Sequence, residues 1–270
     1  MVKLSFCISA SRTLGLVMEK IFFTKKDSIV RQIWGKADTI LFIFAGAAAE
    51  FALNKAVDWL YYTGRLPKDP LGRLFSTVNY AKVIVFAEEK AAFQAIDQMN
   101  KIHAKIEKNR GFKIPEWAYR DVLFMLIDYS IRAFEALERK LTLKEKEEVL
   151  SVFLKVGHGM KIEGLPKDFE GWKQQRKIQL QENFEHSDFT QDLFVQYKKH
   201  LGVARYRLLL EAQILMAPKR VKELLNFREH SVLITVIPLY RLSGSFKIDY
   251  ILKELILPKD YKNDIKALDH

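Results

Sequence analysis

Apolar residues recur every three to four positions along most of this sequence, and that spacing is the period of an α-helix. Two such runs are Phe93, Ile96, Met99, Ile102 and Ile106, and Val122, Leu123, Leu126, Ile127 and Ile131. Residues 231–237 compete as a strand because they are rich in β-branched side chains. Pro238 follows them and no partner strand is evident, so we interpret the segment as a buried helix. Without a strand–helix–strand rhythm elsewhere, the sequence predicts an all-α, multi-helix fold.

Capping residues and prolines mark where these helices should begin. The expected starts are Asp27 for a short helix to Trp34, Asp38 for an apolar helix toward Leu60, Asp69 with Pro70, Pro115, the capping box of Thr142 and Glu145, and Pro166 to Asp168. Later helices are expected at about residues 189–200, 204–216, 221–227 and 248–257.

The chain shows no sign of division into domains. Its 270 residues contain no repeat and no Gly-, Ser- or Pro-rich linker, and 49% hydrophobic residues can bury a large core. We therefore expect a single domain over residues 1–270. The most apolar segment, residues 39–53, is shorter than the roughly 20 residues of a membrane span and contains Glu50, so we interpret it as a buried helix. Small residues at 45–49 make that helix thin enough for close approach by another helix or a flat ligand.

Several kinds of chemistry lack their motifs. The single cysteine, Cys7, excludes an internal disulfide and a thiolate zinc site. The C-x-x-C-H motif of covalent haem attachment is absent, as are the usual hydrolytic-metal, nucleotide-binding and serine-hydrolase motifs. The first residues make a poor signal peptide, because their apolar stretch is short and broken by Arg12. We expect a cytoplasmic location.

The formal net charge of +11 suits nucleic acid, an anionic membrane or an acidic ligand as partner. The lysines are scattered, with the densest pieces at Lys25-Lys26 and Lys198-Lys199, and no RNA-binding motif or basic arm is present. We therefore expect no nucleic-acid partner, and peripheral membrane contact stays open.

His103 is the histidine best placed to carry chemistry. Its helical face is shared by residues 3, 4, 7 and 10 positions away, which are Ile106, Met99, Ile96 and Phe93. Because lysines occupy the other faces, we expect His103 to point inward. A buried imidazole needs a partner, which could be a carbonyl, a carboxylate, water or an iron atom, and spacing alone favours a structural role. The other histidines lie at a helix end or in polar surroundings: His158, His186, His200, His230 and His270.

Arg73 and Thr77 form a second candidate pair. They are four residues apart and therefore share a helical face. Arg73 lies near a helix start, where a cation opposes the helix dipole, so a group from outside the helix should compensate it. That group could be a nearby carboxylate, a haem propionate or an anionic substrate.

Several motifs occur here in the order found in one oxygenase family. They are Asp69-Pro70-Leu71-Gly72-Arg73 with Thr77, Val83-Ile84-Val85-Phe86, Ile102-His103, Glu116-Trp117-Ala118-Tyr119, Leu141-Thr142 with Glu145, Leu165-Pro166, and Ile214-Leu215-Met216-Ala217-Pro218 with Val221 to Leu225. On these motifs the chain resembles the DUF2236 family, the catalytic domain shared by latex-clearing rubber oxygenases and the ER-bound oxygenase MpaB. The resemblance covers about residues 30–226, with additional helices at both ends.

The resemblance implies a globin-like core that binds haem b without a covalent link. His103 would be the proximal iron ligand, with its other nitrogen held by an acceptor. Arg73 would orient a propionate or dioxygen, and Thr77 would line the distal side. Rubber oxygenases have a distal lysine immediately before the threonine, where this chain has Ser76. Lysine ligation of the iron is therefore not expected, and rubber is not implied as the substrate.

We therefore expect a haem b-dependent oxygenase that uses O2 on an apolar, alkene-containing small molecule. One alternative is a haem-binding sensor or carrier that has the same site and no turnover. The other is a non-catalytic helical protein that uses its basic charge at an interaction or membrane surface.

Overall fold

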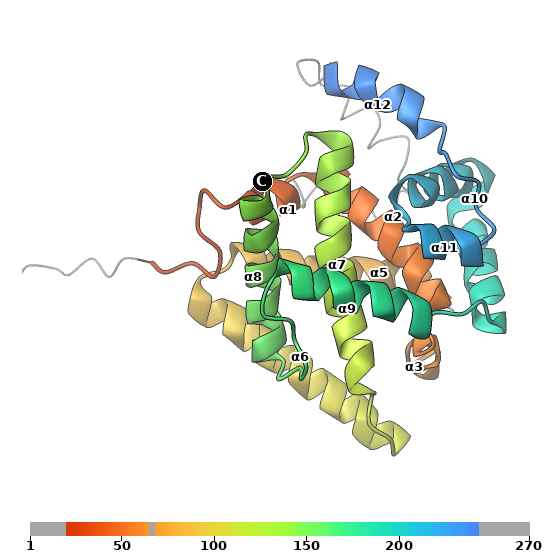
Figure 1. Ribbon diagram of the computed structural model, residues 1–270. Coiled ribbons are helices and arrows are strands. Elements are labelled where there is room, and N and C mark those ends of the chain that lie inside the picture. Colours follow the sequence, from red (N-terminus) through yellow and green to blue (C-terminus); the bar gives the residue numbers. More distant parts are fainter. Residues whose placement is uncertain (1–19, 65–67, 243–270) are drawn as a thin grey trace, which may run out of the picture.

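The computed structural model describes residues 20–64 and 68–242, and this part of the chain is helical with no β-strand (Figure 1). The helices are α1 (Ile29–Trp34), α2 (Ala37–Leu53), α3 (Val57–Tyr62), α5 (Pro70–Phe86), α6 (Glu89–Arg110), α7 (Glu116–Leu137), α8 (Leu143–Gly159), α9 (Phe169–Glu182), α10 (Asp188–Met216), α11 (Lys219–Leu224) and α12 (Leu233–Leu242). The all-α prediction is confirmed. The globin-like topology and the extent of the single domain stay predictions.

Helix α2 is the centre of the core, packed between α7 and α10. Its small residues serve close helix packing. A Cβ on Gly46 would lie 2.2 Å from the ring of Tyr129 on α7, so only glycine fits there. On the other side, the Tyr197 hydroxyl of α10 donates to the Ala48 carbonyl at 3.2 Å. Helices therefore fill both sides of this stretch.

Most of the expected helix starts are confirmed. Asp69 caps α5 with Pro70 in the first turn, Thr142 and Glu145 form a capping box on α8, and Asp168 caps α9. Pro115 immediately precedes α7.

Three of the expected helix boundaries are wrong. Ser28 rather than Asp27 caps α1, because its hydroxyl accepts from the Val30 N–H at 3.1 Å. The apolar helix begins at Ala37, before Asp38, and ends at Leu53 rather than continuing toward Leu60. It ends there because the Asn54 side chain accepts the Ala56 N–H at 2.8 Å in a turn that leads into the separate helix α3.

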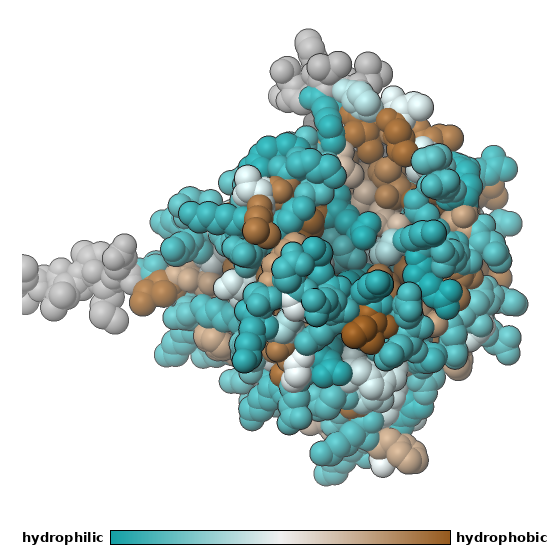
Figure 2. Space-filling view, in the orientation of Figure 1, coloured by the Kyte–Doolittle hydropathy of each residue, from teal (hydrophilic) through white to brown (hydrophobic). Residues whose placement is uncertain are grey.

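The C-terminal helices are also largely as expected. The two segments predicted at 189–200 and 204–216 are the halves of α10, which is kinked at Gly202 with a φ of 72°. The segment at 231–237 is helical from Leu233 onward, but its predicted burial is wrong, because Ile234 and Val236 are about half exposed. Figure 2 shows apolar atoms on the surface near α12. The predicted helix at 248–257 and Cys7 lie outside the described residues.

None of the described helices combines the length and the hydrophobicity that crossing a membrane requires. The most apolar of them, α2, has 17 residues and is buried inside the protein.

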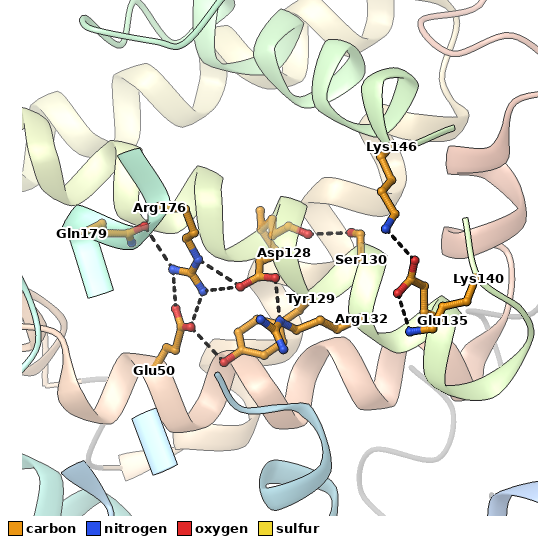
Figure 3. A network of polar contacts seen from close by, with 11 residues as sticks. Glu50, Asp128, Tyr129, Ser130, Arg132, Glu135, Lys140, Lys146, Arg176 and Gln179 are labelled. Atoms are coloured by element: carbon orange, nitrogen blue, oxygen red, sulfur yellow. Dashed lines mark hydrogen bonds and ion pairs between the residues drawn. The ribbon is translucent and has the colours of Figure 1, made fainter. Parts of the chain in front are cut away.

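A network of buried charged side chains connects α2, α7 and α9 (Figure 3). The Arg176 guanidinium of α9 donates to Glu50 Oε2 at 3.0 Å and to Asp128 Oδ2 at 3.0 and 3.1 Å. The Tyr129 hydroxyl donates to Glu50 Oε1 at 2.9 Å, and Arg132 donates to Asp128 Oδ1 at 2.6 Å. Glu50 and Arg176 are almost fully buried, so the charge inside the apolar helix α2 is neutralised by a partner 126 residues further along the chain.

Asp121 is a third buried carboxylate, and no cation among the described residues forms an ion pair with it. It accepts hydrogen bonds from Asn54 at 2.8 Å and from Asn183 at 3.0 and 3.1 Å. Burial raises the pKa of Asp121 to about 6, although both asparagines lower it. The folded protein therefore holds this proton more tightly than the unfolded chain, where the ordinary pKa is 3.8. Ionising Asp121 therefore costs the folded protein stability. This cost is fully present above pH 6 and becomes smaller as the pH falls toward 4, because the carboxyl of the folded protein is then protonated.

We expect wild-type protein to gain about 2 kcal/mol in free energy of unfolding relative to Asp121→Asn when the pH is lowered from 7.5 to 4.5. Urea unfolding of both proteins at the two pH values measures this difference. The contributions of the other titrating groups are the same in both proteins and cancel when the two are compared. Parallel pH curves for the two proteins would contradict it.

Candidate functional site

The sequence-predicted residues lie on two neighbouring helices, Arg73 and Thr77 on α5 and His103 on α6. In Figure 1, α6 runs along the lower edge, and its C-terminal end lies beside the start of α7. That end is held in place from α3. Arg110 forms an ion pair with Asp58 at 2.6 Å, and the Tyr62 hydroxyl donates to the Asn109 carbonyl at 2.9 Å. The site is therefore built on packed helices rather than on a loop.

The face of α6 that carries His103 is buried to different degrees along the helix. Ile96 is fully buried, Met99, His103 and Ile106 are half-buried, and Phe93 is 38% exposed. Phe93 is the most exposed residue of this face, and its ring lies 5.7 Å from that of the buried Phe23.

His103 is shielded from solvent on one side of its ring. Its Nδ1 is buried and has no hydrogen-bond partner among the described residues. The ring of Tyr119 on α7 meets it edge to face, with centroids 5.2 Å apart and an interplanar angle of 66°. The acceptor expected for the second nitrogen of His103 is therefore not found in the described part of the chain.

Burial lowers the pKa of His103 below its ordinary value of 6.5. The positive charge of Arg73 lowers it further, while Glu107 acts in the opposite direction. The imidazole is therefore mainly neutral at pH 7, and a metal ion binds a histidine in this form.

Arg73 and Thr77 share a face of α5, as their spacing predicts. Arg73 Nη1 donates to Thr77 Oγ1 at 2.7 Å and makes a longer contact of 3.4 Å with Ser76 Oγ. Ser76 is exposed and Thr77 is half-buried. The threonine therefore fixes one end of the guanidinium. Since Arg73 lies near enough to His103 to lower its pKa, the structure brings the three predicted residues into one region between α5 and α6.

Two further residues belong to this region: Glu107, which was not singled out from the sequence, and Tyr119, which was named only as part of the motif Glu116-Trp117-Ala118-Tyr119. Glu107 lies one turn after His103, and its Oε1 accepts from the Tyr119 hydroxyl at 3.1 Å and from the Ile114 N–H at 3.0 Å. The spacing of four residues from His103 was the available signal for Glu107. Tyr119 lies on α7, whereas His103 and Glu107 lie on α6, so the contact of Tyr119 with His103 could not be inferred from helical spacing.

The described residues contain no group of three or more His, Cys, Asp or Glu side chains that could hold a metal ion. A haem iron needs only one or two protein ligands, because the porphyrin supplies the other four donors. His103 has the donor chemistry that such a ligand requires, since it is a neutral imidazole with a buried nitrogen that no described protein group occupies.

The fold and the family comparison together define the class of the protein as an all-α oxygenase catalytic domain. Residues 32–241 match the family model described as "ER-bound oxygenase mpaB/B'/Rubber oxygenase, catalytic domain", and the chain belongs to this family. The match includes α5 and α6 and ends in α12. No protein with curated annotation matches the sequence.

Proposed function

We propose that this protein is a haem b-dependent oxygenase that uses O2 on an apolar, alkene-containing small molecule. The observation that carries the proposal is His103, a neutral histidine whose buried Nδ1 has no protein partner among the described residues and which lies near Arg73 within an oxygenase catalytic domain. An unpaired buried polar atom costs about 1–3 kcal/mol, and this cost would be removed only by a group that binds Nδ1 itself.

The residues present fit a haem. His103 would hold the iron through an imidazole nitrogen, and bound haem would supply an iron centre that activates O2. Arg73 carries the positive charge that a propionate or a developing negative charge requires. Thr77 fixes the guanidinium through its 2.7 Å hydrogen bond, so that Arg73 loses less rotational freedom on binding an anion.

The substrate class is proposed from the family and from the side chains of α5. Ser76 occupies the position where rubber oxygenases carry a lysine, so the substrate proposed here is a small apolar alkene, such as an unsaturated lipid or terpenoid, rather than rubber.

We expect Arg73→Ala to lower O2-dependent turnover by about 10²-fold in haem-loaded protein, because a preorganised cation is lost. Turnover is measured as O2 uptake together with loss of an unsaturated lipid or terpenoid. Lys101→Ala is the matched control, since Lys101 is an exposed cation of α6 near His103 in sequence, and this variant should keep wild-type turnover. Equal activities of the two variants would contradict the role of Arg73.

Two outcomes in wild-type protein would overturn the enzyme proposal. Haem-loaded protein without O2-dependent turnover of any unsaturated lipid or terpenoid tested would favour the sensor or carrier. Protein that takes up no haem, and that binds anionic vesicles in a salt-sensitive way unaffected by His103→Ala, would favour the basic interaction protein.

A further inference from the structure

Among the described residues, the ring of His103 is held by a contact with another ring, and none of them forms a hydrogen bond with its Nδ1. Tyr119 approaches it edge to face, with centroids 5.2 Å apart. This geometry is favoured for aromatic pairs, and it restricts rotation of the imidazole without occupying either ring nitrogen. A ligand histidine that is fixed by a hydrogen bond would use one nitrogen for that bond.

Tyr119 is itself held at its other end. Its hydroxyl donates to Glu107 Oε1 at 3.1 Å, and the same oxygen accepts the Ile114 N–H at 3.0 Å. Glu107 belongs to the last turn of α6, and Ile114 lies in the connection to α7. The carboxylate therefore ties the phenol to the α6–α7 connection. The connection turns tightly at Gly111, whose φ of 79° favours glycine.

These contacts form a continuous path that starts and ends on one helix. His103 and Glu107 are one turn apart on α6, and Tyr119 spans them from α7, touching the first with its ring and the second with its hydroxyl. Glu107 therefore holds Tyr119 in contact with His103, in addition to the effect of its charge on the imidazole.

We propose that Tyr119, anchored by Glu107, is the positioning residue that sets the orientation of the His103 imidazole for the iron. The part of this inference that concerns iron rests on the proposed function. The part that concerns the fixed orientation of His103 can be tested without haem. Neither Tyr119 nor Glu107 touches substrate or iron in this proposal.

The first arm uses the protein without haem. Histidine-labelled protein is examined by NMR, with the His103 signals assigned by their loss in His103→Gln. The Tyr119 ring current should displace the His103 carbon-bound protons in wild type. Tyr119→Leu should remove the displacement, and Tyr119→Phe should largely keep it. Unchanged His103 shifts in Tyr119→Leu would overturn the proposal, whatever the haem content of the protein.

The second arm adds hemin and follows the iron–histidine stretching band by resonance Raman spectroscopy together with the rate of hemin loss. We expect a shifted or broadened band and hemin loss about 10- to 100-fold faster in Tyr119→Leu, and a smaller effect in Glu107→Gln and Tyr119→Phe. Tyr62→Leu is the matched control, because Tyr62 also holds the end of α6 but contacts Asn109 instead of His103. Its band should stay at the wild-type position.

The two arms separate the possible failures. If wild-type protein binds no hemin, the proposed function fails while the NMR arm still decides the orientation of His103. If wild type binds hemin and Tyr119→Leu leaves both the Raman band and the rate of hemin loss unchanged, the positioning role is overturned and the proposed function stands.

Discussion

Replacing Arg176 with methionine is expected to lower the free energy of unfolding by about 3–5 kcal/mol at pH 7. Arg176 is the cation between two buried carboxylates, Glu50 and Asp128. Methionine keeps most of the side-chain volume, so the loss measures the charge that is left unpaired rather than a cavity. Urea unfolding of the variant and of wild type measures the difference.

The pH dependence of this loss identifies its cause. Burial raises the pKa of Glu50, and Arg176 is the main group that lowers it. Without Arg176, Glu50 therefore takes up a proton more readily as the pH falls, and the neutral carboxyl no longer needs a cation. The destabilisation by Arg176→Met should accordingly shrink between pH 7 and pH 5.

Lys173→Met is the matched control on the same helix. Lys173 pairs with Glu170 at 3.0 Å, but both side chains are more than half exposed, and such pairs contribute about 0–1 kcal/mol. A similarly small and pH-independent loss in Arg176→Met would contradict a network that neutralises buried charge.

His103→Ala is expected to weaken hemin binding by more than about 100-fold, because it removes the proposed iron ligand, whereas losing a group that merely supports a ligand costs about 10- to 100-fold. The dissociation constant is obtained by titrating the protein with hemin and following the absorption of the complex. The variant should also lose the Soret band of a histidine-ligated haem.

The control for His103→Ala is His158→Ala. His158 is exposed in the last turn of α8, so its removal should leave both the affinity for hemin and the spectrum unchanged. Hemin binding that is weakened equally in both variants would indicate non-specific association with histidines and would remove His103 as the ligand.

Local features of the fold could be predicted from the sequence, because the residues that decide them are neighbours in the chain. The cap at Asp69 and the box of Thr142 and Glu145 each depend on residues within one helical turn. The end of α2 was predicted wrongly because it depends on a single side-chain contact. Apolar periodicity continues past Leu53, whereas the Asn54 turn that breaks the helix depends on one side-chain hydrogen bond to Ala56.

Contacts between distant segments could not be predicted in the same way. Glu50 was visible as an interruption of an apolar helix, but nothing in the linear pattern paired it with Arg176. At the candidate site, spacing placed Arg73 beside Thr77 and gave His103 its helical face. The approach of α5 to α6, and of Tyr119 to His103, depends on how whole helices pack. The functional roles of these residues rest on the family and stay predictions.

Haem binding is tested by the absorption spectrum of purified wild-type protein with and without added hemin. We expect a Soret band that grows to saturation at one hemin per chain and shows histidine ligation that depends on His103. Protein that stays colourless, and that takes up no hemin on titration, would contradict it.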